Sequence, residues 1–183
     1  MEFKTATLEN AEEIANLHIA NWRETYRGAM SDQYLDYEIW AERQKHWLEC
    51  LKDPAENQFV LIAKNGDKLC GFVCAFGDHH AKYGTLVENL HSHKSVRGQG
   101  VGKRLLAKAA EWSLQHYPSA GLYLDVLESN IAAQGFYKAL GGVHVEDRPW
   151  VPPGGGQVIE FSFYWENEDL KKEVEKWGSS RKL

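Results

Sequence analysis

The sequence lacks several features that mark common classes of protein. Its three cysteines, Cys50, Cys70 and Cys74, match no zinc-binding spacing, and an odd number cannot all pair in disulfides. No apolar run approaches the length of a membrane-spanning helix, and Met1 is not followed by an apolar leader. We therefore expect no membrane contact and a location in the reducing cytoplasm.

The chain also lacks an excess of basic residues. It has 21 Lys and Arg against 26 Asp and Glu, a formal net charge of −5. Nucleic acids and anionic membranes attract basic surfaces, so neither is expected as a partner, whereas a cationic acceptor suits this balance. Hydrophobic residues at 43% and charged residues at 26% are ordinary for a globular protein. Without a repeat or a linker, the 183 residues predict one domain, 1–183.

The periodicity of the apolar residues predicts alternating strands and helices. Asn65-Gly66-Asp67 separates two strand-like runs and predicts a hairpin. The strand, helix and strand between residues 85 and 127 predict a right-handed crossover between parallel strands. Charged residues dominate 166–183, where a solvent-exposed helix is expected. The predicted strands cover residues 2–6, 58–63, 69–76, 85–92, 121–127, 143–149 and 157–165, and the predicted helices cover 10–28, 31–53, 101–117 and 129–140.

A glycine-rich turn, residues 97–102, joins the first strand of this crossover to its helix. Glycines ahead of a helix let the backbone approach an anion, and the first N–H groups of the helix point at it. The dinucleotide fingerprint G-x-G-x-x-G requires a glycine where Lys103 stands, and the Walker loop fails on its spacing and on Arg104 in place of Ser or Thr. The pattern that remains is R-x-x-G-x-G, which begins at Arg97.

A second motif follows this helix. The strand Tyr123-Leu124-Asp125-Val126 leads into Asn130-x-x-Ala133-x-x-Phe136-Tyr137-x-x-Leu140-Gly141-Gly142. The two motifs in this order resemble the GNAT superfamily of acyl-CoA-dependent N-acyltransferases, and they make residues 86–142 the CoA-binding core. The resemblance implies a mixed α/β fold. Its mostly antiparallel seven-stranded sheet would contain a central parallel strand pair and be flanked by about four helices, with a C-terminal helix as an addition.

The resemblance implies acetyl-CoA as the acyl donor. The glycine loop would hold the pyrophosphate through backbone N–H groups, and the strand before it would hold the pantetheine arm and the thioester oxygen. Asn130 matches a residue beside the pantetheine, although it is equally a good N-cap. Tyr137 matches the tyrosine that protonates the leaving thiolate, although a core aromatic would have the same spacing. The residues implied for the donor are Leu90, His91, Ser92, Arg97, Gly98, Gln99, Gly100, Val101, Gly102, Lys103, Asn130, Phe136 and Tyr137.

The acceptor side is less defined by the resemblance. Glu88 is the expected general base, acting through a water, with His91 and Asp125 as rivals. The first two helices border the acceptor in this family, so part of the aromatic set at residues 22–40 is expected to line the pocket. Many members have Val-x-Pro before the glycine loop, where this chain has Ser92-His93-Lys94, which leaves the end of the strand open. The residues implied for the acceptor are Trp22, Tyr26, Glu88 and Asp125.

The implied activity is acetyl transfer from acetyl-CoA to a primary amine of a small molecule or peptide, by direct attack in a ternary complex. Direct attack is preferred because no Cys or Ser has a recognisable activated arrangement. The alternative is an acyl-CoA-binding sensor or scaffold without turnover. An oxidoreductase with Asp125 on a ribose is disfavoured by the glycine spacing. His79-His80 and His91-x-His93 lack a catalytic metal signature, so no metal is expected, and a homodimer is left open.

Overall fold

The computed structural model describes residues 1–179 and places seven strands in one sheet of order β1-β2-β3-β4-β5-β7-β6. Neighbouring strands are antiparallel except β4 and β5, which are parallel, so the predicted mixed α/β fold with a central parallel pair is confirmed. The strands are β1 (Glu2–Thr5), β2 (Gln58–Asn65), β3 (Lys68–His80), β4 (Gly84–Ser92), β5 (Leu122–Leu127), β6 (Val143–Trp150) and β7 (Val158–Trp165). The helices are α1 (Ala11–Thr25), α2 (Ile39–Lys52), α3 (Val101–His116), α4 (Ile131–Ala139) and α5 (Asn167–Ser179).

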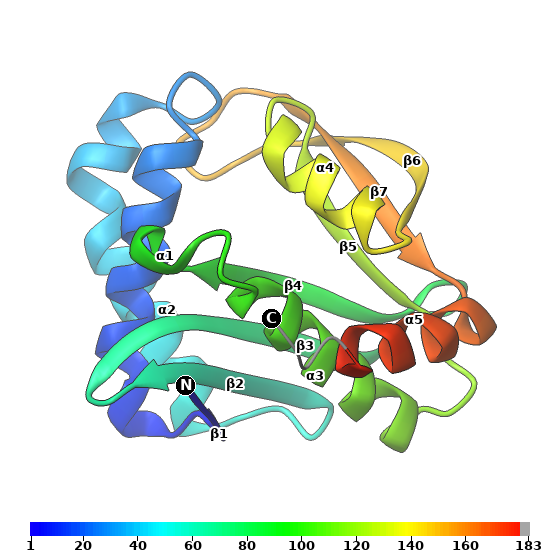
Figure 1. The fold of residues 1–183 in the computed structure, drawn as a ribbon. Helices are drawn as coiled ribbons and strands as arrows, with labels where there is room; N and C mark the ends of the chain where they lie inside the picture. Colours follow the sequence, from blue (N-terminus) through cyan, green and yellow to red (C-terminus); the bar gives the residue numbers. More distant parts are fainter. Residues whose placement is uncertain (180–183) are drawn as a thin grey trace.

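Helices cover both faces of the sheet (Figure 1). On one face, α1 and α2 pack through a cluster that includes the fully buried Ile14, Trp47 and Phe72. On the other face, α3 buries Leu105 and Leu106 in a larger cluster that also takes in α4 and α5. Between residues 1 and 179, no helix has both the length and the apolar character needed to cross a bilayer.

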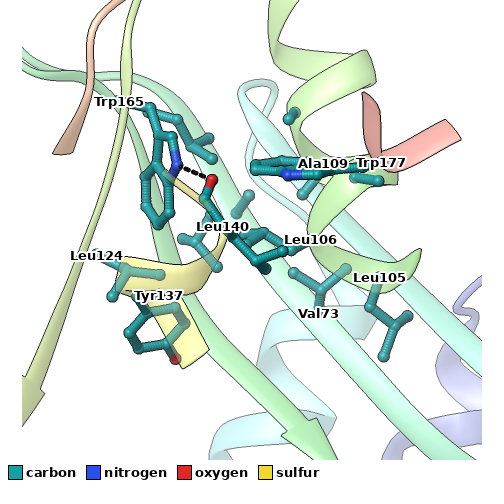
Figure 2. Packing of buried hydrophobic residues seen from close by; sticks show 14 of the residues in the cluster. Val73, Leu105, Leu106, Ala109, Leu124, Tyr137, Leu140, Trp165 and Trp177 are labelled. Carbon is teal, nitrogen blue, oxygen red and sulfur yellow. Dashed lines mark hydrogen bonds between the residues drawn. The ribbon is translucent and has the colours of Figure 1, made fainter. Parts of the chain in front are cut away.

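The C-terminal helix differs from its expected character. It forms as α5, but it is not merely solvent-exposed, because Leu170 and Trp177 are buried against α3. Figure 2 shows Trp177 beside Ala109 of α3, and Trp165 of β7 donating to the carbonyl of Leu140 at 2.9 Å. Apolar positions recur in α5 at helical spacing among many charges, so the charged composition concealed a buried face.

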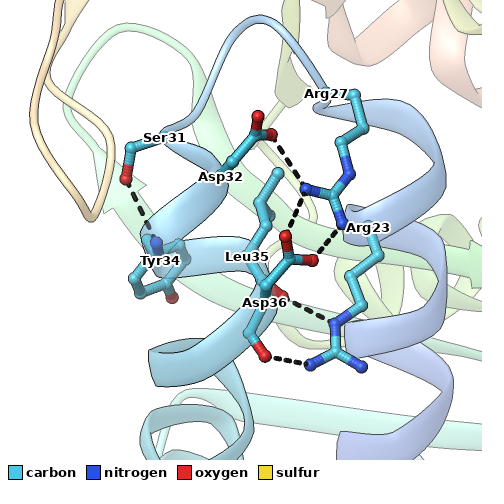
Figure 3. Close-up of polar contacts among 7 residues, drawn as sticks. All are labelled: Arg23, Arg27, Ser31, Asp32, Tyr34, Leu35 and Asp36. Atoms are coloured by element: carbon cyan, nitrogen blue, oxygen red, sulfur yellow. Dashed lines mark hydrogen bonds and ion pairs between the residues drawn. The ribbon is translucent and has the colours of Figure 1, made fainter.

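The turn before α2 is tied to the end of α1 (Figure 3). Residues Tyr34–Glu38 form a π-helical turn there, which leaves irregular backbone carbonyls to satisfy. Arg23 of α1 donates from Nε to the carbonyl of Leu35 at 2.6 Å and from Nη2 to that of Asp36 at 3.1 Å. Arg27 pairs with the carboxylate of Asp36. These contacts fix the two N-terminal helices relative to each other.

The parallel strands β4 and β5 part soon after they pair. Their register ends at Leu86 with Tyr123. Beyond that position β4 stays paired with β3 as far as Ser92, whereas β5 stays paired with β7 as far as Leu127. Figure 1 shows the two strands diverging. Within residues 1–179, this edge of β4 therefore has no neighbouring strand beyond Leu86, and its backbone groups face the gap.

Candidate active site

A cleft of about 950 Å³ opens where β4 and β5 part. Its walls come from α1, α2, β4, β5, α4, β6 and β7, together with residues 151–153 of the β6–β7 loop. The cleft brings together both predicted catalytic residues, all four predicted acceptor residues and part of the predicted donor set. The predicted residues in its wall are Trp22, Tyr26, Glu88, Leu90, His91, Ser92, Arg97, Asp125, Asn130 and Tyr137.

The glycine loop leads from the cleft into α3. Gly98 and Gly100 have φ angles of 76° and 77°, in the left-handed region that favours glycine. Gly100 immediately precedes the helix, and the first N–H groups of a helix have no partner inside it. Together these groups form a main-chain site suited to an anion. Residues 98–103 of the predicted donor set lie beside the cleft rather than in its wall.

The side chain of Arg97 hydrogen-bonds to residues of α1. Its guanidinium donates two bonds of 2.8 Å to the carboxylate of Glu24, and this pairing lowers the pKa of Glu24. It also donates to Oδ1 of the buried Asn21 at 3.2 Å. Asn21 in turn donates to the carbonyl of Ser92 at 3.2 Å. Asn21 thus links the end of β4 to the glycine loop, and the only sequence sign of it was a polar residue on a mostly apolar helix face.

His93 occupies the segment where many family members carry a proline. It begins the short turn Lys94–Val96, and its Nδ1 accepts a hydrogen bond from the backbone N–H of Ser95 at 3.2 Å. The hydroxyl of Ser95 lies 2.7 Å from the same nitrogen. The histidine therefore caps the turn and ends β4 at Ser92 without a proline.

Glu88 is the extra residue of a bulge in β4. The register with β3 shifts here, so that Val87 and Asn89 face successive residues of β3 and Glu88 faces none. The carboxylate lines the cleft and accepts from Nδ2 of Asn89 at 2.9 Å. It stays open to water in the cleft, yet the walls desolvate it and raise the pKa of Glu88, while Arg43 and Asn89 oppose the shift. A raised pKa makes this carboxylate a stronger proton acceptor.

Tyr137 of α4 reaches the cleft from the opposite side of the sheet. Its ring is buried against Phe163 and Trp165, and Figure 2 shows its hydroxyl pointing away from Trp165. Burial, together with the nearby Tyr26, raises the pKa of Tyr137 above its usual range. The phenol therefore keeps its proton at neutral pH, as a proton donor must.

Asn130 and Phe136 lie on the same helix as Tyr137 but in different surroundings. Asn130 caps α4, since its Oδ1 accepts from the N–H of Ala133 at 3.2 Å, and it also lines the cleft. Phe136 packs on the core beside Tyr137 and is not part of the cleft wall. A Cβ placed on Gly102 would lie 3.6 Å from the Phe136 ring, so α4 touches the glycine loop here.

His91 is a poor candidate for the general base. Its ring is enclosed between those of His18 and Phe72. The Nδ1 atom lies 3.3 Å from Nδ2 of Asn21, which can only donate, so this nitrogen accepts. Burial and the charge of Arg97 lower the pKa of His91 to about 4. Its imidazole is therefore neutral near pH 7 but only weakly basic.

Charged residues on the far wall of the cleft were only partly anticipated. Asp125 accepts from Nη2 of Arg148 at 2.6 Å and from the hydroxyl of Ser162 at 2.5 Å. Glu160 lies 3.8 Å from the same guanidinium nitrogen. Burial and Asp125 raise the pKa of Glu160 to about 7, against the pull of Arg148. In the sequence, Glu160 is distinguished only as the single charged residue of the apolar run 158–165.

His79 and His80, one of the two histidine pairs in the sequence, each lie within hydrogen-bonding distance of neighbouring groups. Nδ1 of His79 lies 2.6 Å from the hydroxyl of Tyr123, and Nδ1 of His80 accepts from the N–H groups of Lys82 and Tyr83, both at 3.2 Å. Across the described residues 1–179, no group of three or more His, Cys, Asp or Glu side chains is arranged to hold a metal ion.

The N-terminal helices contribute only part of their aromatic set to the cleft. Trp22 and Tyr26 of α1 line it, whereas Tyr34 is buried in the core and Tyr37 and Trp40 face solvent. The contribution of α2 comes instead from polar side chains that no sequence pattern pointed to. These residues are Arg43 and His46.

The loop between β6 and β7 closes one end of the cleft. Pro152 and Pro153 line it, and Gly154 approaches the π-helical turn. Gly154 has a φ of 86°, and a Cβ there would lie 2.6 Å from the Cβ of Tyr34 and from Oγ of Ser31. Glycine is therefore required both by the backbone conformation and by the close approach.

Comparison with known proteins agrees with this arrangement. The acetyltransferase (GNAT) family matches residues 13–141. The uncharacterized N-acetyltransferase YuaI of Bacillus subtilis (strain 168) is 29% identical over 130 residues, which cover 69% of this chain and 72% of that protein. A GCN5-related N-acetyltransferase structure from Rhodopseudomonas palustris superposes with a TM-score of 0.67 at 18% identity, covering 90% of this chain and 94% of that one.

A structure from Bacillus anthracis, solved in complex with acetyl coenzyme A, is 27% identical with a TM-score of 0.54 and covers 62% of this chain and 64% of that one. The family match spans more than half of the sequence and includes the first motif, the helix after it and the second motif as far as Gly141. The chain belongs to the acetyltransferase (GNAT) family.

Proposed function

We propose that the protein transfers an acetyl group from acetyl-CoA to a primary amine of a small molecule or peptide, by direct attack in a ternary complex. The observation that carries this proposal is the parting of β4 from β5. It leaves a strand edge open beside the glycine-capped start of α3, and Glu88 and Tyr137 enter the same gap from opposite sides.

The residues present fit acetyl-CoA. The main chain at Gly98 to Lys103 would hold the pyrophosphate, because the left-handed glycines and the helix N-terminus both favour an anion. The open edge of β4 at Leu90 to Ser92 would bind the pantetheine arm and orient the thioester carbonyl. Acetyl coenzyme A in the Bacillus anthracis relative supports this donor.

The proposed chemistry uses one group on each side of the thioester. The neutral amine attacks the carbonyl carbon, the C–N bond forms, and the C–S bond breaks. Glu88 takes the proton lost by the amine through a water, which its raised pKa favours. Tyr137 gives its phenolic proton to the leaving thiolate sulfur, and its own raised pKa keeps that proton available until then.

The positions of the cysteines support direct attack over a covalent acyl-enzyme. Cys70 and Cys74 are buried, Cys50 is partly buried, and none of the three lines the cleft. A nucleophilic thiol would have to reach the thioester and lie beside a base. The amine of the acceptor is therefore the attacking group in this proposal.

The proposal is tested by release of CoA thiol from acetyl-CoA against a panel of primary amines. Turnover with at least one amine is expected, with one acetylated product per thiol. Tight binding of acetyl-CoA without thiol release from any amine would instead support a non-catalytic acyl-CoA-binding module. Tyr137→Phe separates the two functions further, because it should leave CoA affinity intact while lowering turnover.

A further inference from the structure

The acceptor end of the cleft carries more negative than positive charge once internal ion pairs are counted. Six charged side chains line the cleft. Arg97 is paired with Glu24, and Arg43 is paired with Glu42. Neither of these two glutamates lies in the cleft wall. Three carboxylates line the cleft, Glu88, Asp125 and Glu160. Arg148 lies beside two of them, Asp125 and Glu160, whereas the cation that acts on Glu88 is Arg43.

Arg148 interacts more closely with Asp125 than with Glu160. Asp125 receives a hydrogen bond of 2.6 Å from it and a second bond from Ser162. Glu160 is 3.8 Å from the same nitrogen, beyond ordinary hydrogen-bond length. Its side chain is 15% exposed and opens into the cleft. Glu160 is thus the less neutralised member of the pair, and a cation in the cleft would supply the missing charge.

Strand order separates Glu160 from Glu88. Asp125 lies opposite Ser162, and Glu160 lies opposite Arg148, so these side chains project from one face of the sheet. Trp150, two residues beyond Arg148, packs with the cluster of α1 and the π-helical turn, which identifies that face as the α1 side. β5 lies between β4 and β7, and β4 has already parted from β5 at Glu88, so the backbones that carry the two carboxylates are at least two strand spacings, about 10 Å, apart. Two cationic groups suit such a separation better than one.

We propose that Glu160, held beside Asp125 and Arg148, determines acceptor specificity by binding a second cationic group of the acceptor while the reacting amine lies at Glu88. The acceptor class is therefore a small molecule with two amino groups separated by several bonds. This inference rests on the proposed acetyl transfer and adds the substrate class to it. The raised pKa of Glu160 agrees with a carboxylate that lacks a full counter-charge.

Aromatic rings of the same wall suit such a ligand. Trp22, Tyr26 and Trp150 line this end of the cleft, and the face of an aromatic ring attracts an ammonium group. Tyr26 lies close enough to Glu160 for the carboxylate to add to the effect of burial, which is the larger cause, and together they raise the pKa of its phenol to about 12. Its hydroxyl therefore stays neutral and adds no competing charge.

The test compares α,ω-diamines of four, six and eight carbons with monoamines of the same chain length. Thiol release is measured for the wild type, for Glu160→Gln and for Glu56→Gln, an exposed glutamate outside the cleft. Binding of the same amines to the complex with CoA is measured by calorimetry. We expect the wild type to prefer a diamine. Glu160→Gln should lower kcat/KM for that diamine about tenfold, mostly through KM, because a charge-assisted contact is lost.

The monoamine values should change by less than about twofold, since they make no contact with Glu160. Glu160→Asp, which keeps the charge, should retain part of the preference, and Glu56→Gln should behave as the wild type. A wild type that prefers no diamine, or a Glu160→Gln variant that loses diamine and monoamine activity equally, would overturn the inference while acetyl transfer stands. If a diamine binds in a way that depends on Glu160 but no amine causes thiol release, the proposed transfer is overturned, while the inferred binding of a second cationic group at Glu160 stands. If a diamine neither binds nor reacts, the inference falls.

Discussion

The two ends of the cleft are built in different ways. The proposed donor end, made of the β4 edge at Leu90 to Ser92 and the glycine loop beside the cleft, offers mainly backbone groups that are close in sequence. The proposed acceptor end is made of side chains from α1, α2, β4, β5, β6 and β7. A main-chain site depends on local conformation, whereas a side-chain site depends on how distant elements pack. A main-chain site of this kind can therefore be recognised from a local sequence motif, whereas a side-chain site of this kind cannot.

The largest expected effect is on the residue that joins the two ends. Tyr137→Phe removes the phenolic proton while keeping the buried ring, so we expect kcat to fall about 100-fold with CoA affinity unchanged. Single-turnover rates and calorimetric titration with CoA measure the two quantities. An unchanged kcat would remove Tyr137 from the chemistry and leave it as a core aromatic.

A second prediction concerns stability at the proposed acceptor end. The pKa of Glu160 is about 7 in the folded protein, above its usual 4.5, so the folded state loses stability as the pH rises from about 4.5 to about 7. The charged or titratable groups that face it are Asp125 on β5, Arg148 on β6 and Tyr26 on α1. Glu160→Gln removes the buried charge. We therefore expect the unfolding free energy of the variant to exceed that of the wild type by about 2 kcal/mol at pH 8.

Urea unfolding of this variant and the wild type at several pH values gives the comparison. The advantage of the variant should shrink as the pH falls and vanish near pH 4, where Glu160 is protonated in both states. A variant that is less stable than the wild type at pH 8 would mean that attraction to Arg148 outweighs the desolvation of Glu160.

A third prediction concerns the main-chain character of the donor end. Gly100 has a φ of 77°, and a Cβ added there would meet no atom within 4 Å, so Gly100→Ala should cost about 1 kcal/mol of unfolding free energy through backbone strain alone. It should also weaken CoA binding. Gly135 is the matched control, because it lies inside α4 with open space and an ordinary φ. Gly135→Ala should stabilise by about 1 kcal/mol.

Thermal and chemical unfolding, each with and without CoA, measure both glycine variants. Equal effects of Gly100→Ala and Gly135→Ala on CoA affinity would contradict the idea that the left-handed turn forms the donor seat.

The smallest effect is expected at the ion pair between Glu24 and Arg97. Both side chains are about half exposed, so Glu24→Gln should change the unfolding free energy by only about 0.5 kcal/mol. CoA affinity should stay within about twofold if the loop binds through its backbone. Calorimetry with CoA decides this, and a tenfold loss would show that the donor end also depends on the placement of the Arg97 side chain.

The difference between the ends also explains what the sequence could predict. The glycine loop and the helix that carries Asn130 and Tyr137 are local patterns, and so are the seven strands. The family resemblance could therefore be inferred from residues 86–142. The bulge at Glu88 could not be inferred from the sequence, because a bulge is defined by the register of β4 against β3 and not by the residues next to Glu88 in the chain.

Long-range contacts account for the rest of what was missed. Glu160, Arg148 and Asn21 lie far apart in sequence and enter the cleft only when β5, β6, β7 and α1 assemble. The buried face of α5 was missed because Leu170 and Trp177 are few among charged residues. Of the aromatic residues predicted for the acceptor pocket, Trp22 and Tyr26 lie in the cleft wall, but the polar contribution of α2 has no local pattern.

The most direct test of acetyl transfer in a ternary complex is a two-substrate initial-rate study with acetyl-CoA and the best amine found. We predict one thiol released per acetylated amine and rate lines that intersect, because donor and acceptor occupy the two ends of one cleft together. Parallel lines, the pattern of a covalent acyl-enzyme, would contradict direct attack. The absence of any acetylated product across the amine panel would contradict the proposed function itself.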